Sequence, residues 1–172
     1  ECADFVELVS NPAQMPEILY RAINTAIGKQ GVAVLVLPGD VALSEAPAAS
    51  PRHWVADQPQ RIAPTSTEID RLVGLLNQAK APAILAGAGC AGAHTELVSV
   101  AKALKAPIVH ALRGKEYVEY DNPYDVGMTG LIGFSSGYHT LMSADAVLML
   151  GTSFPYRAFY PKEATMIQVD RD

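Results

Sequence analysis

Short runs of apolar residues that do not alternate with polar ones constrain the fold of this chain most strongly. The clearest run is 32–37, and further strands are predicted over 83–86, 108–111, 146–150 and 165–169. A strand that is apolar on both faces must be covered on both faces, which is typical of a parallel sheet between helices. Helical segments alternate with these runs, so the sequence predicts an α/β fold with an open parallel sheet and right-handed crossovers.

The helical segments carry their own boundary signals. Helices are predicted over residues 12–27, from a start at 65–68 to residue 79, over 94–104 and over 136–143. Asn11 can cap the first helix and Gly28 can end it. Thr65 and Glu68 have the spacing of a capping box, in which each side chain satisfies a backbone amide at the helix start. The stretch 112–133 is rich in glycine and proline, and it is predicted as a long connection.

Composition excludes several classes of function. The net charge of −5 provides no basic surface for a phosphate backbone, so we expect no nucleic-acid partner. The longest apolar run, 32–38, is far shorter than the ~20 residues of a membrane span. Two cysteines give no disulfide framework and favour a reducing cytoplasm. The four histidines are widely spaced and show no metal-binding pattern.

A change in composition indicates two units. Residues 44–64 are rich in small residues and proline, which is typical of an extended linker. We therefore predict a tail of one α/β domain at 1–47, a linker at 48–60 and a second domain at 61–172. The chain starts and stops inside sequence that looks structured, and we expect it to be a piece of a longer protein.

The second unit has glycines where a nucleotide could bind. Ligands of open α/β sheets bind beyond the carboxyl ends of the strands, and Gly87, Gly89 and Gly92 follow the 83–86 strand as G-x-G-x-x-G. The acidic residue that a dinucleotide fold places at the end of the next strand is missing from 110–113. Two interpretations stay open: contact with a pyrophosphate, or a tight turn from strand to helix. Cys90, inside this turn, is predicted to be a small buried side chain.

Two further loops are candidates for a ligand site. Residues 127–137 contain four glycines and three hydroxyl side chains before a helix, so their amides and hydroxyls suit a phosphate. The alternative is a flexible loop with a helix cap. Phe154, Tyr156, Phe159 and Tyr160 either flank a flat ring system or pack their own loop.

Three segments resemble one family of enzymes. They are 110–116, 119–133 and 150–156, and the strand at 36–41 supports them. They resemble bacterial pyruvate dehydrogenase (quinone), also called pyruvate oxidase, which uses thiamine diphosphate and FAD. The resemblance covers nearly the whole chain. It implies that 1–47 ends a pyrimidine-binding domain and that 61–172 is a Rossmann-like central domain, truncated at its end.

The resemblance also implies a set of FAD contacts. They are Thr129, Gly130, Leu131, Ile132, Thr152, Ser153, Phe154, Pro155, Tyr156 and Asp170. Asp170 is expected to hold the ribose hydroxyls of the adenosine. The resemblance favours flavin contact for the aromatic loop. No catalytic residue and no metal ligand is expected in the chain.

The whole enzyme implied by the resemblance decarboxylates pyruvate to acetate and CO2 and passes electrons through FAD to ubiquinone. It is expected to be a cytoplasmic homotetramer, peripheral to the inner face of the cell membrane. Thiamine diphosphate and magnesium would bind outside this chain, because the chain lacks the Gly-Asp-Gly…Asn motif and the glutamate-bearing helix. The chain alone would anchor FAD without catalysis. The alternatives are the central domain of an acetolactate synthase-like enzyme and a structural domain without a cofactor.

Overall fold

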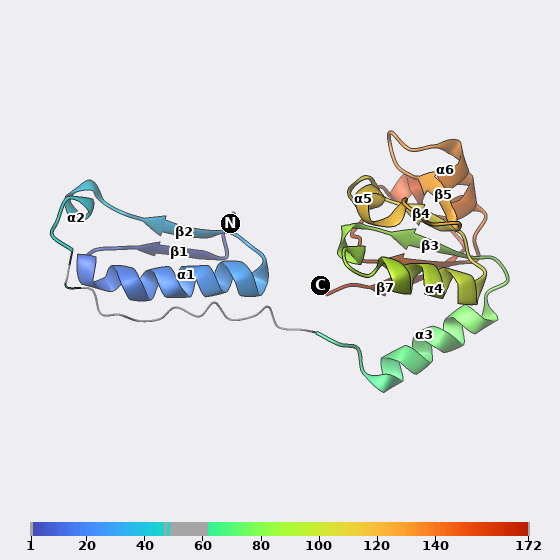
Figure 1. Ribbon diagram of the computed structural model, residues 1–172, viewed down its shortest axis with the longest axis horizontal. Coiled ribbons are helices and arrows are strands. Elements are labelled where there is room, and N and C mark those ends of the chain that lie inside the picture. Colours follow the sequence, from blue (N-terminus) through green and yellow to red (C-terminus); the bar gives the residue numbers. More distant parts are fainter. Residues whose placement is uncertain (1, 47, 49–61, 172) are drawn as a thin grey trace. The chain divides into compact units, whose positions relative to one another are not determined.

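The structure, a computed structural model, describes residues 2–46, 48 and 62–171. The chain divides into two compact units, Glu1–Ile62 and Ala63–Asp172, and each is described by itself (Figure 1). Within the described part of the chain, no helix is both long and apolar enough to cross a bilayer. The linker predicted at 48–60 lies outside the described residues, apart from residue 48.

The first unit is a two-stranded parallel sheet with one long helix. Its elements are β1 (Phe5–Leu8), η1 (Pro12–Gln14), α1 (Met15–Lys29), β2 (Ala33–Val36) and α2 (Gly39–Ala42). The prediction that the 32–37 run is buried on both faces is wrong here. Val34 and Val36 are 38% and 44% exposed, because α1 covers only the opposite face of β1 and β2.

Helix α1 confirms its predicted start but not its predicted end. The Asn11 side chain accepts a hydrogen bond from the Ala13 amide at 2.9 Å, as expected of a cap. The helix continues past Gly28 to Lys29, and Gln30 takes the left-handed conformation with φ of 49°. A glycine signals a helix end only where the chain turns at that residue, and here the turn comes two residues later.

The second unit confirms the predicted α/β fold with an open parallel sheet. Its sheet contains β3 (Pro82–Ala86), β4 (Ile108–His110), β5 (Asp125–Met128), β6 (Ala146–Leu150) and β7 (Thr165–Val169). The strand order is β5-β4-β3-β6-β7, and every neighbouring pair is parallel. Along the chain, β4 and β5 are added on one side of β3, and β6 and β7 are then added on its other side. This 3-2-1-4-5 order is that of a nucleotide-binding Rossmann fold, with its switch point between β3 and β6.

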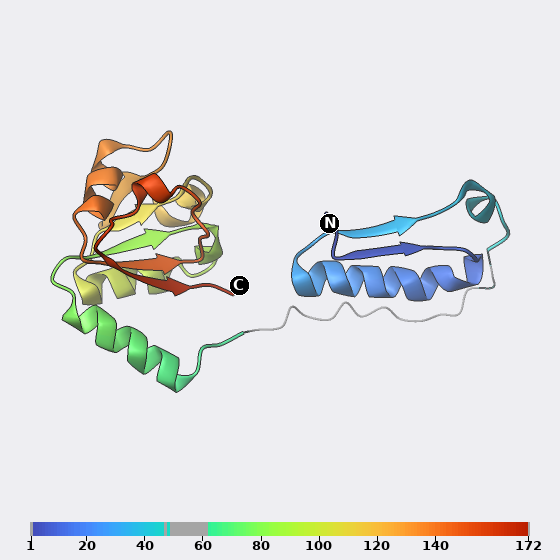
Figure 2. The same ribbon diagram turned by 180° about the vertical axis from the view of Figure 1, so that it is seen from behind.

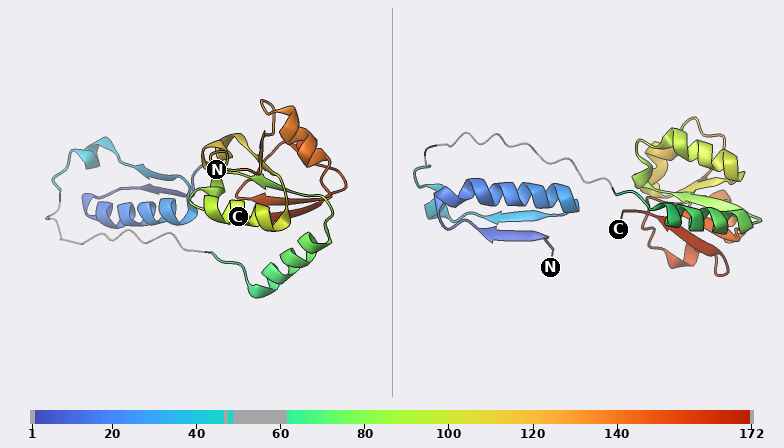
Figure 3. Two further views of the ribbon diagram at one scale, coloured as in Figure 1. Left: turned by 45° about the vertical axis from the view of Figure 1, so that its right-hand side comes forward. Right: turned by 90° about the horizontal axis from the view of Figure 1, so that it is seen from below.

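Helices cover both faces of this sheet, as Figures 1 and 2 show from opposite sides. They are α3 (Ser66–Gln78), α4 (His94–Leu104), α5 (Lys115–Val118) and α6 (Ser135–Met142), with short turns η2 (Ala88–Cys90), η3 (Leu112–Gly114) and η4 (Arg157–Phe159). One core includes Leu76, Ile84 and Leu97 and joins α3 and α4 to the sheet. The other includes Leu85, Leu141 and Phe154 and joins α6 and the 154–160 loop to the opposite face. Figure 3 shows the sheet and its covering helices from two further directions.

The capping box that begins α3 is confirmed. The Thr65 hydroxyl accepts from the Glu68 amide, and the Glu68 carboxylate accepts from the Thr65 amide at 2.7 Å. The Glu68 carboxylate also accepts from the Thr65 hydroxyl at 2.8 Å, and its hydrogen bonds from the Thr65 amide and hydroxyl lower the pKa of Glu68.

The prediction that 112–133 is a connection without regular structure is wrong. This stretch contains η3, α5 and the edge strand β5. Strand β5 reads Asp-Val-Gly-Met, and neither aspartate nor glycine favours a strand by itself. Pairing with β4 determines this strand, and that pairing joins residues far apart in the sequence.

Candidate functional site

The predicted contact positions lie at the carboxyl ends of three strands. Thr129 follows β5, Thr152 follows β6 and Asp170 follows β7. Because all neighbouring strands are parallel, these ends share one edge of the sheet. Strands β5 and β7 are four strand spacings apart, which corresponds to roughly 19 Å. Only an elongated ligand could contact all three positions.

The glycine turn after β3 is packed against the loop after β6. The amides of Gly87 and Gly89 donate to the carbonyls of Leu150 and Gly151 at 2.9 and 3.0 Å. A Cβ on Gly87 would lie 2.5 Å from the Gly151 carbonyl oxygen, and one on Gly89 would lie 2.6 Å from the Gly151 Cα. This close backbone approach supports the tight-turn interpretation of these glycines. Pyrophosphate contact at the turn stays a prediction.

Thr129 is the first residue of the loop 129–133 that follows β5, called the glycine loop below. Its exposed fraction is 3%. Its amide donates to the His110 carbonyl at 3.0 Å, while its Oγ1 has no hydrogen-bond partner among the described residues. A buried hydroxyl without a partner is costly, which suits a site that a ligand completes. Thr129 is therefore the predicted site residue whose surroundings best fit a bound polar group.

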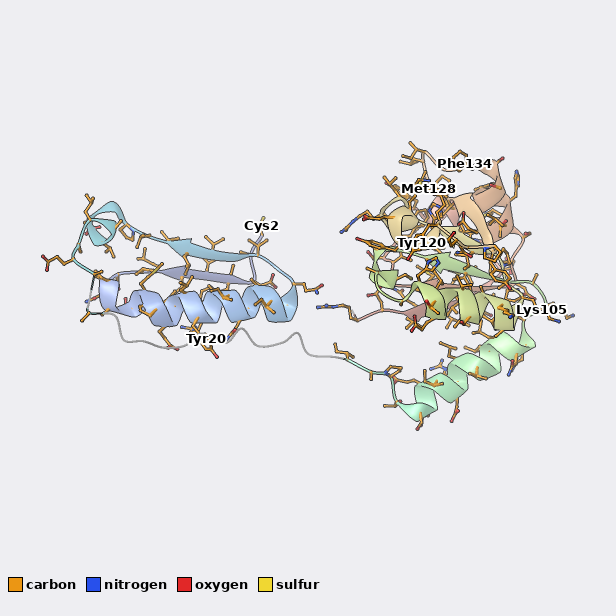
Figure 4. The ribbon with its side chains drawn as sticks, viewed as in Figure 1. Cys2, Tyr20, Lys105, Tyr120, Met128 and Phe134 are labelled. Atoms are coloured by element: carbon orange, nitrogen blue, oxygen red, sulfur yellow. The ribbon has the colours of Figure 1, made fainter. Side chains whose placement is uncertain are left out.

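The rest of the glycine loop is open. Gly130 has φ of 113°, and a Cβ there would lie 3.3 Å from the Phe154 ring, so the loops after β5 and β6 meet at this point. Leu131 and Ile132 are 72% and 68% exposed. Met128 and Phe134, which bound this loop, are labelled in Figure 4.

The aromatic residues of the β6 loop pack mainly on one another. Phe154 makes edge-to-face contacts with Tyr156, Phe159 and Tyr160, at centroid distances of 5.2 to 6.2 Å. The Tyr160 hydroxyl also donates to the Phe154 carbonyl. This geometry supports the alternative in which the cluster packs its own loop. Tyr156 is exposed at 41%, so it is the ring of this cluster best placed for a ligand.

The remaining predicted positions differ in exposure. Thr152 is buried, and its carbonyl accepts from the Gln168 side chain at 3.4 Å. Ser153 and Pro155 are exposed. Asp170 is exposed and accepts a hydrogen bond from the Arg171 amide at 2.8 Å. The structure thus leaves the Asp170 carboxylate accessible at the end of β7.

A cluster of ionisable side chains around β4 and β5, with His110 at its buried centre, was not found from the sequence. His110 is 1% exposed, and its Nε2 lies 3.6 Å from Asp125 Oδ1 and 3.8 Å from Glu119 Oε2. Burial raises the pKa of Asp125, while His110 and a hydrogen bond from the Gly127 amide act in the opposite direction. Lys115 forms an ion pair with Glu119, and this contact lowers the pKa of Glu119. Only the pairing of β4 with β5 brings these groups together.

A hollow of about 470 Å³ lies beside the glycine turn, at the ends of β3 and β4. It is lined by Ala88, Leu112, Arg113, Lys115, Glu116 and Tyr117. Cys90, next to this turn, is buried as predicted, and burial raises the pKa of its thiol. No group of three or more metal-ligating side chains occurs among the residues with described positions.

Comparison with known families gives one match over most of the chain. The family model described as "Thiamine pyrophosphate enzyme, central domain" matches residues 69–172.

Several curated proteins are similar over nearly the whole chain. An uncharacterized 42.6 kDa protein of Pseudomonas amyloderamosa is 57% identical over 99% of this chain and 43% of its own length. A putative thiamine pyrophosphate-containing protein of Bacillus subtilis is 35% identical over 100% of this chain and 30% of its own length. Pyruvate oxidase of Lactiplantibacillus plantarum is 30% identical over 91% of this chain and 26% of its own length. The chain therefore spans less than half the length of these relatives.

A solved structure shows the same fold. Benzoylformate decarboxylase of Polynucleobacter necessarius matches 99% of this chain and 33% of its own, with a TM-score of 0.76 and 22% identity.

Proposed function

Because the chain belongs to the thiamine pyrophosphate enzymes, whose central-domain model matches residues 69–172, we propose that it is the FAD-binding part of a pyruvate oxidase-like enzyme. The observation that carries the proposal is the edge of the sheet where Thr129, Thr152 and Asp170 lie. Its width of roughly 19 Å suits a dinucleotide.

The residues of this edge fit an FAD molecule. The Thr129 hydroxyl, which lacks a hydrogen-bond partner among the described residues, and the amides of the glycine loop offer hydrogen bonds to polar groups. The accessible Asp170 carboxylate suits the ribose hydroxyls, and the exposed ring of Tyr156 suits contact with a flat ring. This chain binds and orients the cofactor, and FAD supplies the electron-accepting chemistry.

The proposed reaction belongs to the whole enzyme. Pyruvate and water give acetate, CO2, two protons and two electrons. The electrons pass through FAD to ubiquinone, which takes up two protons. Family membership implies thiamine diphosphate, and typically Mg²⁺, in that enzyme, and both would bind outside this chain. We also propose a cytoplasmic homotetramer that docks on the inner face of the cell membrane.

The test is an FAD titration of the full-length protein that carries this chain, followed by equilibrium dialysis. We expect bound FAD, and we expect Asp170→Ala to weaken it, because one charge-assisted contact to the ribose is lost. Asp70→Ala, an exposed acidic change on α3, is the matched control. Absence of FAD binding in the full-length protein would favour a structural central domain instead.

An acetolactate synthase-like enzyme is the second candidate. A second relative supports it. A probable acetolactate synthase large subunit of Methanococcus aeolicus is 28% identical over 95% of this chain and 29% of its own length. Anaerobic mixing with pyruvate separates the two candidates. An oxidase reduces its flavin and bleaches the visible absorbance band, whereas a synthase forms its product with the flavin still oxidised.

A further inference from the structure

Strand β5 lies at the edge of the sheet and is held by an irregular ladder. Its register against β4 shifts between Ile108, which pairs with Asp125, and His110, which pairs with Met128. An edge strand has only one neighbouring strand, so a break in that single ladder leaves its end weakly fixed. Thr129 follows directly on this end, where the Thr129 amide donates to the His110 carbonyl and the Phe134 amide donates to the Met128 carbonyl.

The side chains of His110 and Asp125 add a second contact between β4 and β5. Asp125 Oδ1 lies 3.6 Å from the buried His110 Nε2 and has no hydrogen-bond partner among the described residues, so His110 is the charged or polar group that faces it. Gly127 has φ of 102°, so the chain bends there, two residues before Thr129. The His110 carbonyl in turn accepts from the Thr129 amide at 3.0 Å. His110 thus contacts both sides of the bend, through its side chain at Asp125 and through its backbone carbonyl at Thr129.

We infer that His110 and Asp125 are positioning residues that hold the Gly127 bend and present the Thr129 hydroxyl to the bound cofactor. This inference deepens the proposed function and rests on it for the identity of the ligand. Glu119 and Lys115 complete the surroundings, because Glu119 Oε2 lies 3.8 Å from His110 Nε2 and pairs with Lys115. Neither residue of the pair needs to touch FAD.

The first test does not require FAD. Amide hydrogen exchange of the 172-residue chain is measured by NMR for His110→Gln and Asp125→Asn. We expect the Thr129 amide to exchange roughly tenfold faster in both variants, about the effect of one net hydrogen bond. The Gly87 amide, bonded to Leu150 in the sheet centre, should keep its rate. Equal acceleration of both amides, or no change at Thr129, overturns the inference.

The second test is a double-mutant cycle on FAD affinity in the full-length protein. Thr129→Ala alone should weaken FAD binding roughly fivefold to tenfold, the effect of one hydroxyl hydrogen bond. In the Asp125→Asn background, Thr129→Ala should weaken FAD binding less than twofold, because the Thr129 hydroxyl is already displaced in that background. Additive losses overturn the inference. The combined His110→Gln, Asp125→Asn variant replaces the pair by two amides that can hydrogen-bond each other, and it should recover part of the affinity.

These outcomes separate the inference from the proposed function. If the wild-type full-length protein binds no FAD while Thr129 exchange rises in the variants, the proposed ligand is wrong and the positioning role stands. His139→Gln on α6 and Asp70→Asn on α3 are matched surface controls, and both should leave exchange and affinity unchanged.

Discussion

Gly89 and Gly151 pack backbone against backbone at the switch point of the sheet, and the Gly89 amide donates to the Gly151 carbonyl at 3.0 Å. A methyl group on Gly89 would lie 2.6 Å from the Gly151 Cα. The turn after β3 and the loop after β6 can be this close only because both residues lack a side chain.

Gly89→Ala should therefore destabilise the second unit by about 1–3 kcal/mol, the usual cost of overpacking. Chemical denaturation followed by circular dichroism measures this. Gly74→Ala is the matched control, because Gly74 is exposed inside α3 and has open space around it. That change should stabilise the helix by about 0.5–1 kcal/mol. A neutral Gly89→Ala would contradict the packing described at the switch point.

Asp145 joins the end of α3 to the start of β6. Its carboxylate accepts from the amides of Lys80 and Ala81 at 2.7 and 2.9 Å, and these hydrogen bonds lower its pKa. A carboxyl group with a lowered pKa stabilises the fold above its unfolded pKa of about 3.8, and this stability is lost as the pH falls through the lowered value. Asp145→Asn should reduce the melting temperature at pH 7 and change it little at about pH 2. Equal reductions at both pH values would contradict this role.

The two cysteines should differ in reactivity. Cys2 is exposed, whereas Cys90 is buried and its thiol pKa is raised chiefly by desolvation. A raised pKa leaves less thiolate at pH 8, and burial blocks access as well. A disulfide reagent should titrate one thiol promptly in the folded chain and the second only after denaturation. Cys2→Ser should abolish the prompt reaction, and prompt labelling of Cys90 would contradict the packing of the glycine turn.

In the aromatic loop after β6, different residues should matter for stability and for the proposed FAD binding. Phe154 is buried among three other rings, so Phe154→Ala should cost about 3–5 kcal/mol of stability. Tyr156 is exposed at 41%, and Tyr156→Ala should cost no more than about 1 kcal/mol while weakening FAD binding in the full-length protein. Unfolding curves and FAD titrations of both variants test this. Unchanged FAD affinity in Tyr156→Ala would remove that ring from the proposed site.

Local signals predicted much of the second unit. The capping box of Thr65 and Glu68, and the apolar runs that became β3, β4, β6 and β7, are encoded within a few consecutive residues. Such signals can therefore be recognised in the sequence without knowing how the rest of the chain folds. The edge strand β5 was missed because its four residues carry no strong local preference.

Local patterns did not predict which faces of some segments would be buried, or what would pack against them. The 32–37 run reads as buried on both faces, yet Val34 and Val36 are exposed on the face that α1 does not cover. The glycines at 87 and 89 allowed two interpretations, and the packing of Gly151 against them supported the turn.

The sequence by itself determined the helices, most of the strands and the positions at strand ends where a ligand could bind, because these depend on neighbours along the chain. The tertiary structure alone decided that β5 joins the sheet and that His110 meets Asp125. It also decided that the Thr129 hydroxyl is buried with no hydrogen-bond partner in the part of the chain that the structure describes. Those features depend on contacts between residues distant in sequence, and a hydrophobic pattern or a cap carries no information about which distant residue will be the neighbour.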